Sequence, residues 1–174
     1  MKTIVIYNSQ TGFTKQYAGW ISEELSCECV SLKQVGKINF ADYEAIVFGS
    51  WCMAGSLKKT DWFKKQLLPL AQSGKKLIVF AVGASDADSP EIKAAMDKIF
   101  TDEEKKLVKL FYCPGGLSYE RMGGFSRFAL KMFAKALASK KDATEADRKM
   151  ADMISHSYDI SDKKYIAPIV AEIK

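Results

Sequence analysis

Thr3-Ile4-Val5-Ile6-Tyr7, a short apolar run, leads through one residue into Ser9-Gln10-Thr11-Gly12-Phe13-Thr14, where a helical pattern begins. The run has the length and β-branched composition of a buried strand. A strand that turns directly into a helix presents free backbone N–H groups at the positive end of the helix dipole. The three hydroxyls of the turn add donors, and Gly12 lets the backbone close around a ligand. The stretch therefore predicts a phosphate-binding turn.

Two common phosphate-binding motifs do not fit this turn. A P-loop has the pattern G-x-x-x-x-G-K-(S/T), but here Lys15 follows Thr14 and no glycine stands five residues before Gly12. A dinucleotide-binding fingerprint needs three spaced glycines, and the turn has one. An ordinary hydroxyl-rich turn that caps a helix remains an alternative, because Ser and Thr are preferred at such positions.

The pattern that remains is (S/T)-x-T-G-x-T directly after the first strand, and Ser9 to Thr14 match every defined position. This pattern resembles the phosphate-binding loop of flavodoxins, whose ligand is flavin mononucleotide (FMN). The resemblance implies that FMN is the cofactor. It also implies that the flavin is contacted by Ser9, Gln10, Thr11, Gly12, Phe13 and Thr14.

Short apolar runs alternate with helical patterns along most of the chain, which is typical of buried parallel strands joined by crossover helices. The predicted strands are Thr3–Tyr7, Cys27–Leu32, Ala45–Gly49, Lys76–Val82 and Val108–Cys113. Helices are predicted near Thr14–Ser26, Thr60–Gln72 and Ser89–Ile99, with an irregular crossover over Gln34–Tyr43. The order predicts an α/β fold: a flavodoxin-like doubly wound five-stranded parallel sheet of order 2-1-3-4-5 with helices on both faces.

In such a sheet the ligand binds at the carboxyl ends of the strands, so the loop after the third strand is a second candidate. It reads Gly49-Ser50-Trp51-Cys52-Met53-Ala54-Gly55-Ser56 and resembles the glycine, serine or threonine, tryptophan stretch of flavodoxins. We expect flavin contacts from Ser50, Trp51, Cys52, Met53, Ala54 and Gly55, with the Trp51 indole against the isoalloxazine ring. A tryptophan folded into the core is the alternative.

The loop after the fourth strand, Gly83-Ala84-Ser85-Asp86-Ala87-Asp88, is the third candidate wall of the site. Its small residues allow a close backbone approach, so we expect Gly83, Ala84 and Ser85 to lie near the flavin. Asp86 and Asp88 are expected instead to cap the following helix.

Other chemistries lack the residues that they need. A phosphoacceptor receiver domain with the same sheet would carry acidic and basic groups at the strand ends, where this chain has Asn8, Ser50 and Pro114. Four scattered cysteines and a single histidine, His156, give too few ligands for a zinc site, so no metal is expected. No catalytic residue is expected either, because a flavin itself carries the redox chemistry.

The length of 174 residues and the 48% hydrophobic content predict a single flavodoxin-like domain over residues 1–174. The chain shows no signal peptide, and its longest apolar runs, such as Leu77–Ala84, are far shorter than the ~20 residues of a membrane span. We therefore expect a soluble cytoplasmic protein with reduced cysteines.

The formal net charge of +5 comes from one segment, because residues 121–141 hold six basic and no acidic side chains. This segment lies in a predicted helical insertion, about 115–158, that precedes a closing helix over Ser161–Ile173. Helices are predicted within it at Met122–Ala138 and Thr144–Ser157. No nucleic-acid partner is expected.

The predicted helix Met122–Ala138 is amphipathic. Arg127, Lys131 and Lys135 fall together on one face, and the apolar positions of helical spacing are Phe125, Phe128, Ala129, Met132, Phe133, Ala136 and Leu137. Such a helix suits peripheral contact with an anionic membrane, here the inner membrane face, or docking on an acidic partner. The alternative is that its apolar face covers the rest of the domain.

The insertion also carries a resemblance. A turn at Gly115-Gly116-Leu117-Ser118-Tyr119, followed by Phe125-Ser126-Arg127-Phe128, resembles the branch of the flavodoxin superfamily that includes menaquinone-dependent protoporphyrinogen oxidase. Two functions therefore stay open. The first is FMN-dependent electron transfer with a redox partner protein, and the alternative is an FMN-dependent oxidoreductase acting on a quinone or a porphyrinogen. The oligomeric state is left open.

Overall fold

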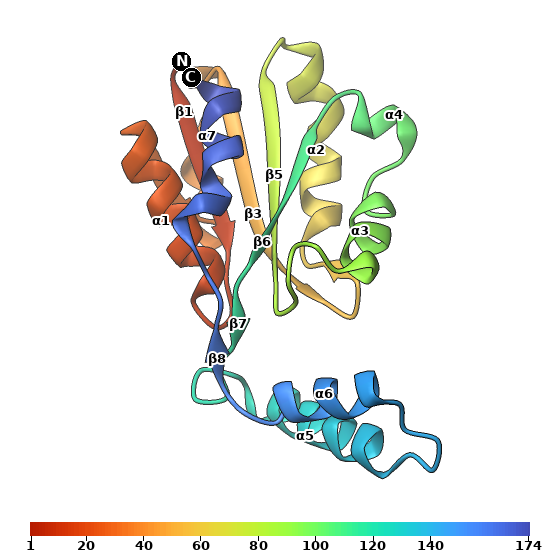
Figure 1. Cartoon of the computed structure of the whole chain (residues 1–174). Coiled ribbons are helices and arrows are strands. Elements are labelled where there is room, and N and C mark those ends of the chain that lie inside the picture. The colour runs from red at the N-terminus through yellow and green to blue at the C-terminus, as the bar shows by residue number, and fades with distance from the viewer. The chain divides into compact units, whose positions relative to one another are not determined.

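The computed structural model describes all residues, 1–174, and divides them into two compact units. Unit 1 comprises Met1–Gly115 and Ile160–Lys174, and unit 2 comprises Gly116–Asp159. Figure 1 shows the strands of a central sheet in unit 1 and a pair of helices in unit 2. No helix of the chain combines the length and the apolar character needed to cross a lipid bilayer.

The main sheet of unit 1 has five parallel strands in the order β2-β1-β3-β5-β6, which confirms the predicted fold class. The predicted fourth and fifth strands are labelled β5 and β6, because the two-residue strand β4 precedes them in the chain. The strands are β1 (Thr3–Asn8), β2 (Glu28–Ser31), β3 (Ala45–Met53), β4 (Ser56–Leu57), β5 (Lys76–Gly83) and β6 (Lys109–Pro114).

Helices cover both faces of this sheet (Figure 1). The helices of unit 1 are α1 (Phe13–Leu25), η1 (Leu32–Lys37), η2 (Phe40–Asp42), α2 (Thr60–Gln72), α3 (Pro90–Asp97), α4 (Asp102–Lys105), η3 (Lys163–Ile166) and α7 (Ala167–Ile173). The predicted irregular crossover is the pair of 3-10 helices η1 and η2. The predicted closing helix is wrong in one respect, since it begins as η3 and only becomes α-helical at Ala167.

The sheet is buried on both faces because the middle positions of β1, β3 and β5 are continuous apolar runs. On β1, Ile4 and Ile6 pack with Phe63 of α2, whereas Val5 packs on the opposite side with Tyr17 of α1. The same alternation continues along β3 and β5. Continuous apolar runs are what a parallel sheet with helices on both sides requires.

The prediction that the third strand ends at Gly49 is wrong. β3 continues to Met53 and folds back on β4 as a hairpin, with Cys52 opposite Leu57. The turn is made by Ala54 and Gly55, which have φ values of 50° and 75°. Two successive left-handed residues are typical of a tight hairpin turn. The predicted loop is therefore an extended strand with a two-residue tip.

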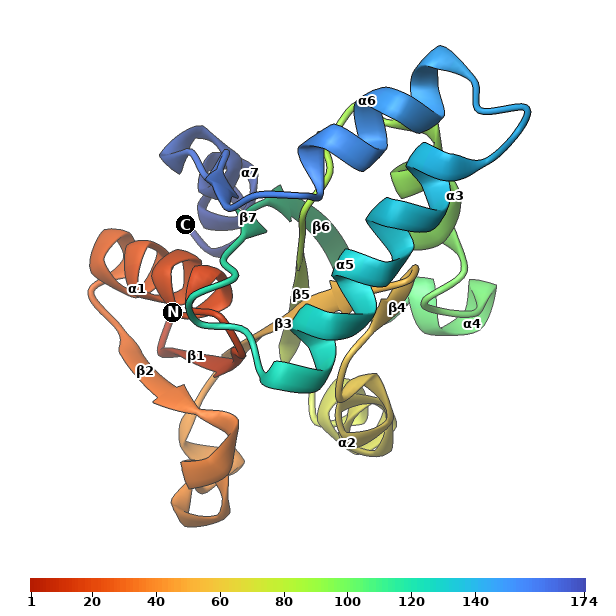
Figure 2. The same ribbon diagram turned by 90° about the horizontal axis from the view of Figure 1, so that it is seen from below.

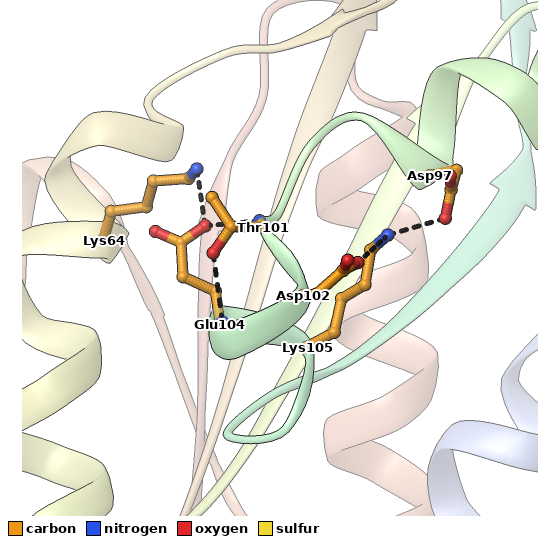
Figure 3. A network of polar contacts seen from close by, with 6 residues as sticks. All are labelled: Lys64, Asp97, Thr101, Asp102, Glu104 and Lys105. Atoms are coloured by element: carbon orange, nitrogen blue, oxygen red, sulfur yellow. Dashed lines mark hydrogen bonds and ion pairs between the residues drawn. The ribbon is translucent and has the colours of Figure 1, made fainter.

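The short helix α4 was not among the predicted elements. It begins with a capping box, in which Thr101 Oγ1 accepts from Glu104 N–H and the Glu104 carboxylate accepts from Thr101 N–H. The same carboxylate accepts from Lys64 Nζ of α2 at 2.8 Å, and the helix is therefore joined to α2 (Figure 3). Nearby, Lys105 pairs with Asp97 and Asp102.

Unit 2 is a helix pair closed by a two-stranded ribbon. Its elements are β7 (Gly116–Leu117), α5 (Gly124–Ser139), α6 (Glu145–Met153) and β8 (Tyr158–Asp159). β7 and β8 pair antiparallel, and α5 lies beside α6 (Figure 2). Tyr119 reinforces the base of the pair, because its hydroxyl donates to Ile154 O at 2.5 Å. The second predicted helix is shorter than expected and ends at Met153.

Candidate functional site

Three of the predicted segments begin at neighbouring positions on one edge of the sheet. Asn8, the last residue of β1, stands opposite Ser50 of β3, and Asn8 Nδ2 donates to Ser50 Oγ at 3.0 Å. One residue further along β3, Trp51 stands opposite Val82 of β5, and Gly83 follows. The carboxyl ends of β1, β3 and β5 are therefore adjacent. This edge includes the point where the strand order reverses, which is where ligands bind in such sheets.

The turn from β1 into α1 is built around Gly12. This residue has φ 102°, a value that side-chain-bearing residues rarely adopt, and it is the N-cap of α1. Its N–H donates to Ser9 Oγ at 3.1 Å, and its carbonyl accepts from Gln16 N–H at 2.9 Å. The first turn of α1 carries no acidic side chain. The positive end of the helix dipole therefore faces no competing negative charge from the helix itself.

Phe13 and Thr14 differ from the other residues of this turn because they are buried. The Phe13 ring packs into the core on the α1 side of the sheet, together with Tyr17 and Val82. Its side chain anchors the start of α1, so only its backbone remains available to a ligand. Ser9, Thr11 and Gly12 are half-buried.

The β3–β4 hairpin holds the second group of predicted residues. The Trp51 side chain is half-buried, and Lys58 Nζ lies 5.7 Å from the centre of its ring. The hairpin is closed by a bond from Lys58 N–H to Trp51 O at 3.0 Å. Burial raises the pKa of the Cys52 thiol to about 12, so this cysteine stays neutral at ordinary pH.

The segment Gly83–Ser85 is held by a tyrosine that the sequence did not single out. Tyr112 of β6 donates its hydroxyl to Ser85 O at 2.9 Å and accepts from Ser85 N–H at 3.3 Å. A Cβ at Gly83 would lie 2.5 Å from this hydroxyl. The glycine is therefore required by Tyr112 itself. In the sequence, Tyr112 reads only as one more large residue of a strand.

A second tyrosine, Tyr17 of α1, was also not predicted. Its buried hydroxyl donates to Pro114 O at 2.5 Å and accepts from Asp162 N–H at 3.1 Å. Burial raises the pKa of this phenol well above its usual range. Tyr17 thus joins three segments to one another: α1, the end of β6, and the chain that returns from unit 2 at Asp162.

The two aspartates after Ser85 were expected to cap the following helix. Asp86 and Asp88 do not cap α3, because its N-cap is Ser89, whose hydroxyl donates to Glu91. No cluster of histidine, cysteine and carboxylate side chains is arranged to hold a metal ion. A hollow of about 670 Å³ lies along the outer edge of β6, between α3 and Glu172, and its lining contains none of the predicted flavin contacts.

Comparison with known proteins gives one family and several structural likenesses. Residues 4–144 match the family model described as the flavodoxin domain. The structure of oxidised flavodoxin 2 from Bacillus cereus is 16% identical, covering 89% of this chain and 98% of that chain, with a TM-score of 0.49. A flavoprotein in complex with FMN from Lactobacillus acidophilus NCFM is 17% identical, covering 65% and 91%, with a TM-score of 0.44. No curated protein matches the sequence.

The family match covers most of the 174 residues, and it includes the turn, the hairpin and the Gly83–Ser85 segment. The chain therefore belongs to the family of flavodoxin domains.

Proposed function

We propose that this chain binds FMN at the edge of the sheet where β1, β3 and β5 end. The observation that carries the proposal is the adjacency of three segments that are separated in sequence: Ser9–Thr14, Ser50–Gly55 and Gly83–Ser85. Family membership supports the same site. In this proposal residues 1–174 are one flavodoxin-like domain, and unit 2 is a helical insertion after β6.

The turn at Ser9–Thr14 fits the phosphate of FMN. Gly12 has a left-handed backbone, and the helix that follows directs its positive end toward the turn. Ser9 Oγ fixes the turn by accepting from Gly12 N–H. The turn is therefore held by its own residues, which reduces the entropy lost on binding.

The other two segments fit an aromatic ring. Trp51 presents a half-buried indole from a hairpin whose tip is fixed by Ala54 and Gly55. Tyr112 fixes the backbone of Ser85, which follows the neighbouring strand β5. An apolar flat surface beside ordered backbone polar groups suits a flat aromatic ring with one polar edge.

The function that we propose is electron transfer with a redox partner protein. FMN supplies the redox chemistry when bound, and the residues of the site bind and orient it. Burial holds the Cys52 thiol of the site neutral, so this cysteine is not expected to act as a nucleophile.

The alternative proposal is an FMN-dependent oxidoreductase that acts on a quinone or a porphyrinogen, as the protoporphyrinogen oxidase branch does. The feature that favours it is the helical unit inserted after β6, which an electron carrier does not need. In this alternative the insertion contributes to substrate binding.

Two experiments test these proposals in turn. FMN affinity is measured by flavin fluorescence for the parent chain, for Thr11→Ala with Thr14→Ala, and for Ser155→Ala in unit 2 as a control. We expect the double change to weaken binding several-fold or more, because a bond to a charged group contributes about 1.5–3 kcal/mol. Unchanged affinity would reject the phosphate site.

The FMN-loaded protein is then assayed for reduction by a flavodoxin reductase, and for protoporphyrinogen oxidation with a menaquinone analogue. Rapid reduction by the protein donor without turnover of either small substrate supports the carrier. Turnover of protoporphyrinogen supports the alternative.

A further inference from the structure

Helix α5 carries large apolar side chains that unit 2 does not bury. The exposed fractions of these side chains are 86% for Phe125, 64% for Phe128, 51% for Met132 and 52% for Phe133. Elsewhere the exposed large apolar residues are single and scattered, such as Leu68 on α2 and Leu107 after α4. A contiguous exposed patch of this kind marks an interaction surface.

The exposed residues are distinct from those that hold the helix pair together. Ala134 is the buried residue of α5, and Leu130 and Leu137 lie on the same helical side at spacings of four and three residues. Ala151 and Ile154, in and after α6, are buried in the same unit. Phe125 and Met132 lie on the opposite side of α5. The helix therefore has a second apolar face that its own fold does not use.

Arg127, Lys131 and Lys135 share one side of α5, as their spacing predicts. The Arg127 guanidinium folds back along the chain, with Nη2 donating to Met122 O at 3.3 Å and Nε buried. Lys131 and Lys135 are exposed and border the apolar face on one side.

Charge defines the chemistry of a partner for this face. Residues 121–141 hold six basic side chains and no acidic one; of the six, Arg127 folds back on Met122 and Lys140 pairs with Asp147 of α6 at 3.5 Å. The exposed apolar side chains form a convex ridge on a single helix, about 24 Å long for its 16 residues. A deformable anionic surface can accept such a ridge without a matching groove, and long lysine side chains can lie along its boundary.

We propose that α5 is a membrane-docking helix. It lies in the plane of an anionic bilayer with Phe125, Phe128, Met132 and Phe133 inserted below the headgroups and with its lysines at the lipid phosphates. Docking does not depend on the proposed flavin function, since it uses residues of unit 2 alone.

Sedimentation with vesicles tests the docking helix. The full chain is mixed with sucrose-loaded vesicles of phosphatidylcholine and phosphatidylglycerol, and separately with vesicles of phosphatidylcholine alone. We expect binding to the anionic vesicles, weaker binding at high salt, and little binding to the neutral ones, because surface charges attract basic segments. Absence of binding to anionic vesicles at low salt would overturn the proposal.

Two sets of variants assign the binding to α5. Phe125→Ser, Phe128→Ser and Phe133→Ser together should lower the partition coefficient about tenfold or more, because each removes apolar area from the lipid. Lys131→Glu with Lys135→Glu should lower it by a similar factor. The matched controls, Leu68→Ser and the exposed pair Lys33→Glu with Lys37→Glu in unit 1, should leave it within about twofold. Equal losses in variants and controls would contradict the assignment.

Two further measurements separate docking from other causes. Far-ultraviolet circular dichroism should be unchanged in the phenylalanine variants, because these side chains are exposed. All three tryptophans lie in unit 1, so Phe128→Trp adds one reporter to unit 2. Its fluorescence should be quenched by brominated lipid. If the parent chain is instead a dimer that the phenylalanine changes dissociate, and no vesicle binds, the face is an interface between two copies and the membrane proposal fails.

Discussion

The sheet of unit 1 and the helix pair of unit 2 bury their apolar residues to very different extents. In unit 1, Phe48, Phe63 and Phe80 are almost fully buried between two layers of helices. In unit 2, Phe125 and Phe128 are among the most exposed side chains of their kind. Similar residues therefore have different environments: in the first unit they form the core of the fold, and in the second they are exposed to solvent.

The largest loss of stability should come from adding a side-chain atom where two strands of the sheet pack most closely. A Cβ at Gly49 would lie 1.9 Å from Phe80 Cζ, because the two residues stand opposite each other on β3 and β5. Gly49→Ala should lower the free energy of unfolding of unit 1 by about 3 kcal/mol, as overpacking does. Urea titration measures this change in the free energy of unfolding. Gly19→Ala, with open space around it in α1, should stabilise by about 0.5–1 kcal/mol.

A smaller loss of stability is expected at Tyr17, which lies where the chain returns from unit 2 to unit 1. Tyr17→Phe leaves Pro114 O and Asp162 N–H without their phenol partner, and this should cost about 1–3 kcal/mol in urea unfolding. Tyr7→Phe on β1 is the matched control. Equal effects of the two changes would show that the hydroxyl of Tyr17 has no special role.

The ion pair between α2 and α4 should make a modest, pH-dependent contribution. Burial tends to raise the pKa of Glu104, but bonds from Lys64 and Thr101 lower it more, and the net shift is downward. A lowered folded-state pKa gives stability that is present above the ordinary glutamate pKa and is lost as the pH falls through the folded value.

Lys64→Met should therefore destabilise by no more than about 1 kcal/mol at neutral pH and flatten the loss of stability in acid. Thermal melts across this pH range measure both effects, with the exposed Lys65→Met as control. If Lys64→Met lost stability at acidic pH as steeply as the parent chain, the role of this ion pair would be contradicted.

The smallest stability effect should come from the exposed face of α5. Phe128→Ala should change the stability of unit 2 by less than about 0.5 kcal/mol, because the side chain is already in water. Tyr119→Phe in the same unit removes a buried bond to Ile154 O and should cost about 1 kcal/mol. Hydrogen exchange of the α5 and α6 amides reports on unit 2 by itself. A large loss for Phe128→Ala would show that this face is part of the core.

Local signals account for what the sequence predicted well. The turn after β1 is encoded by adjacent residues, so its strand, its glycine and its helix were all placed within one residue of their positions. The five main strands were placed from apolar runs of strand length, which likewise do not depend on contacts between distant segments. Their order in the sheet came instead from the doubly wound topology that alternating strands and helices indicate.

Features that depend on such contacts were missed. The extension of β3 requires Cys52 to pair with Leu57 across a turn, and the sequence read as a loop there. Tyr17 and Tyr112 act through partners far along the chain. Helical spacing alone also could not tell which apolar residues of α5 face α6. The capping box of α4, in contrast, is a local pattern of Thr101 and Glu104 that the sequence displays, although the helix was not predicted from it.

The central proposal is that the turn around Gly12 holds the phosphate of FMN. Titration of the flavin-free protein with FMN and with riboflavin, which lacks the phosphate, tests it most directly. We predict that FMN binds at least about tenfold more tightly, since several charge-assisted hydrogen bonds depend on the phosphate. Equal affinity for the two flavins would contradict the account.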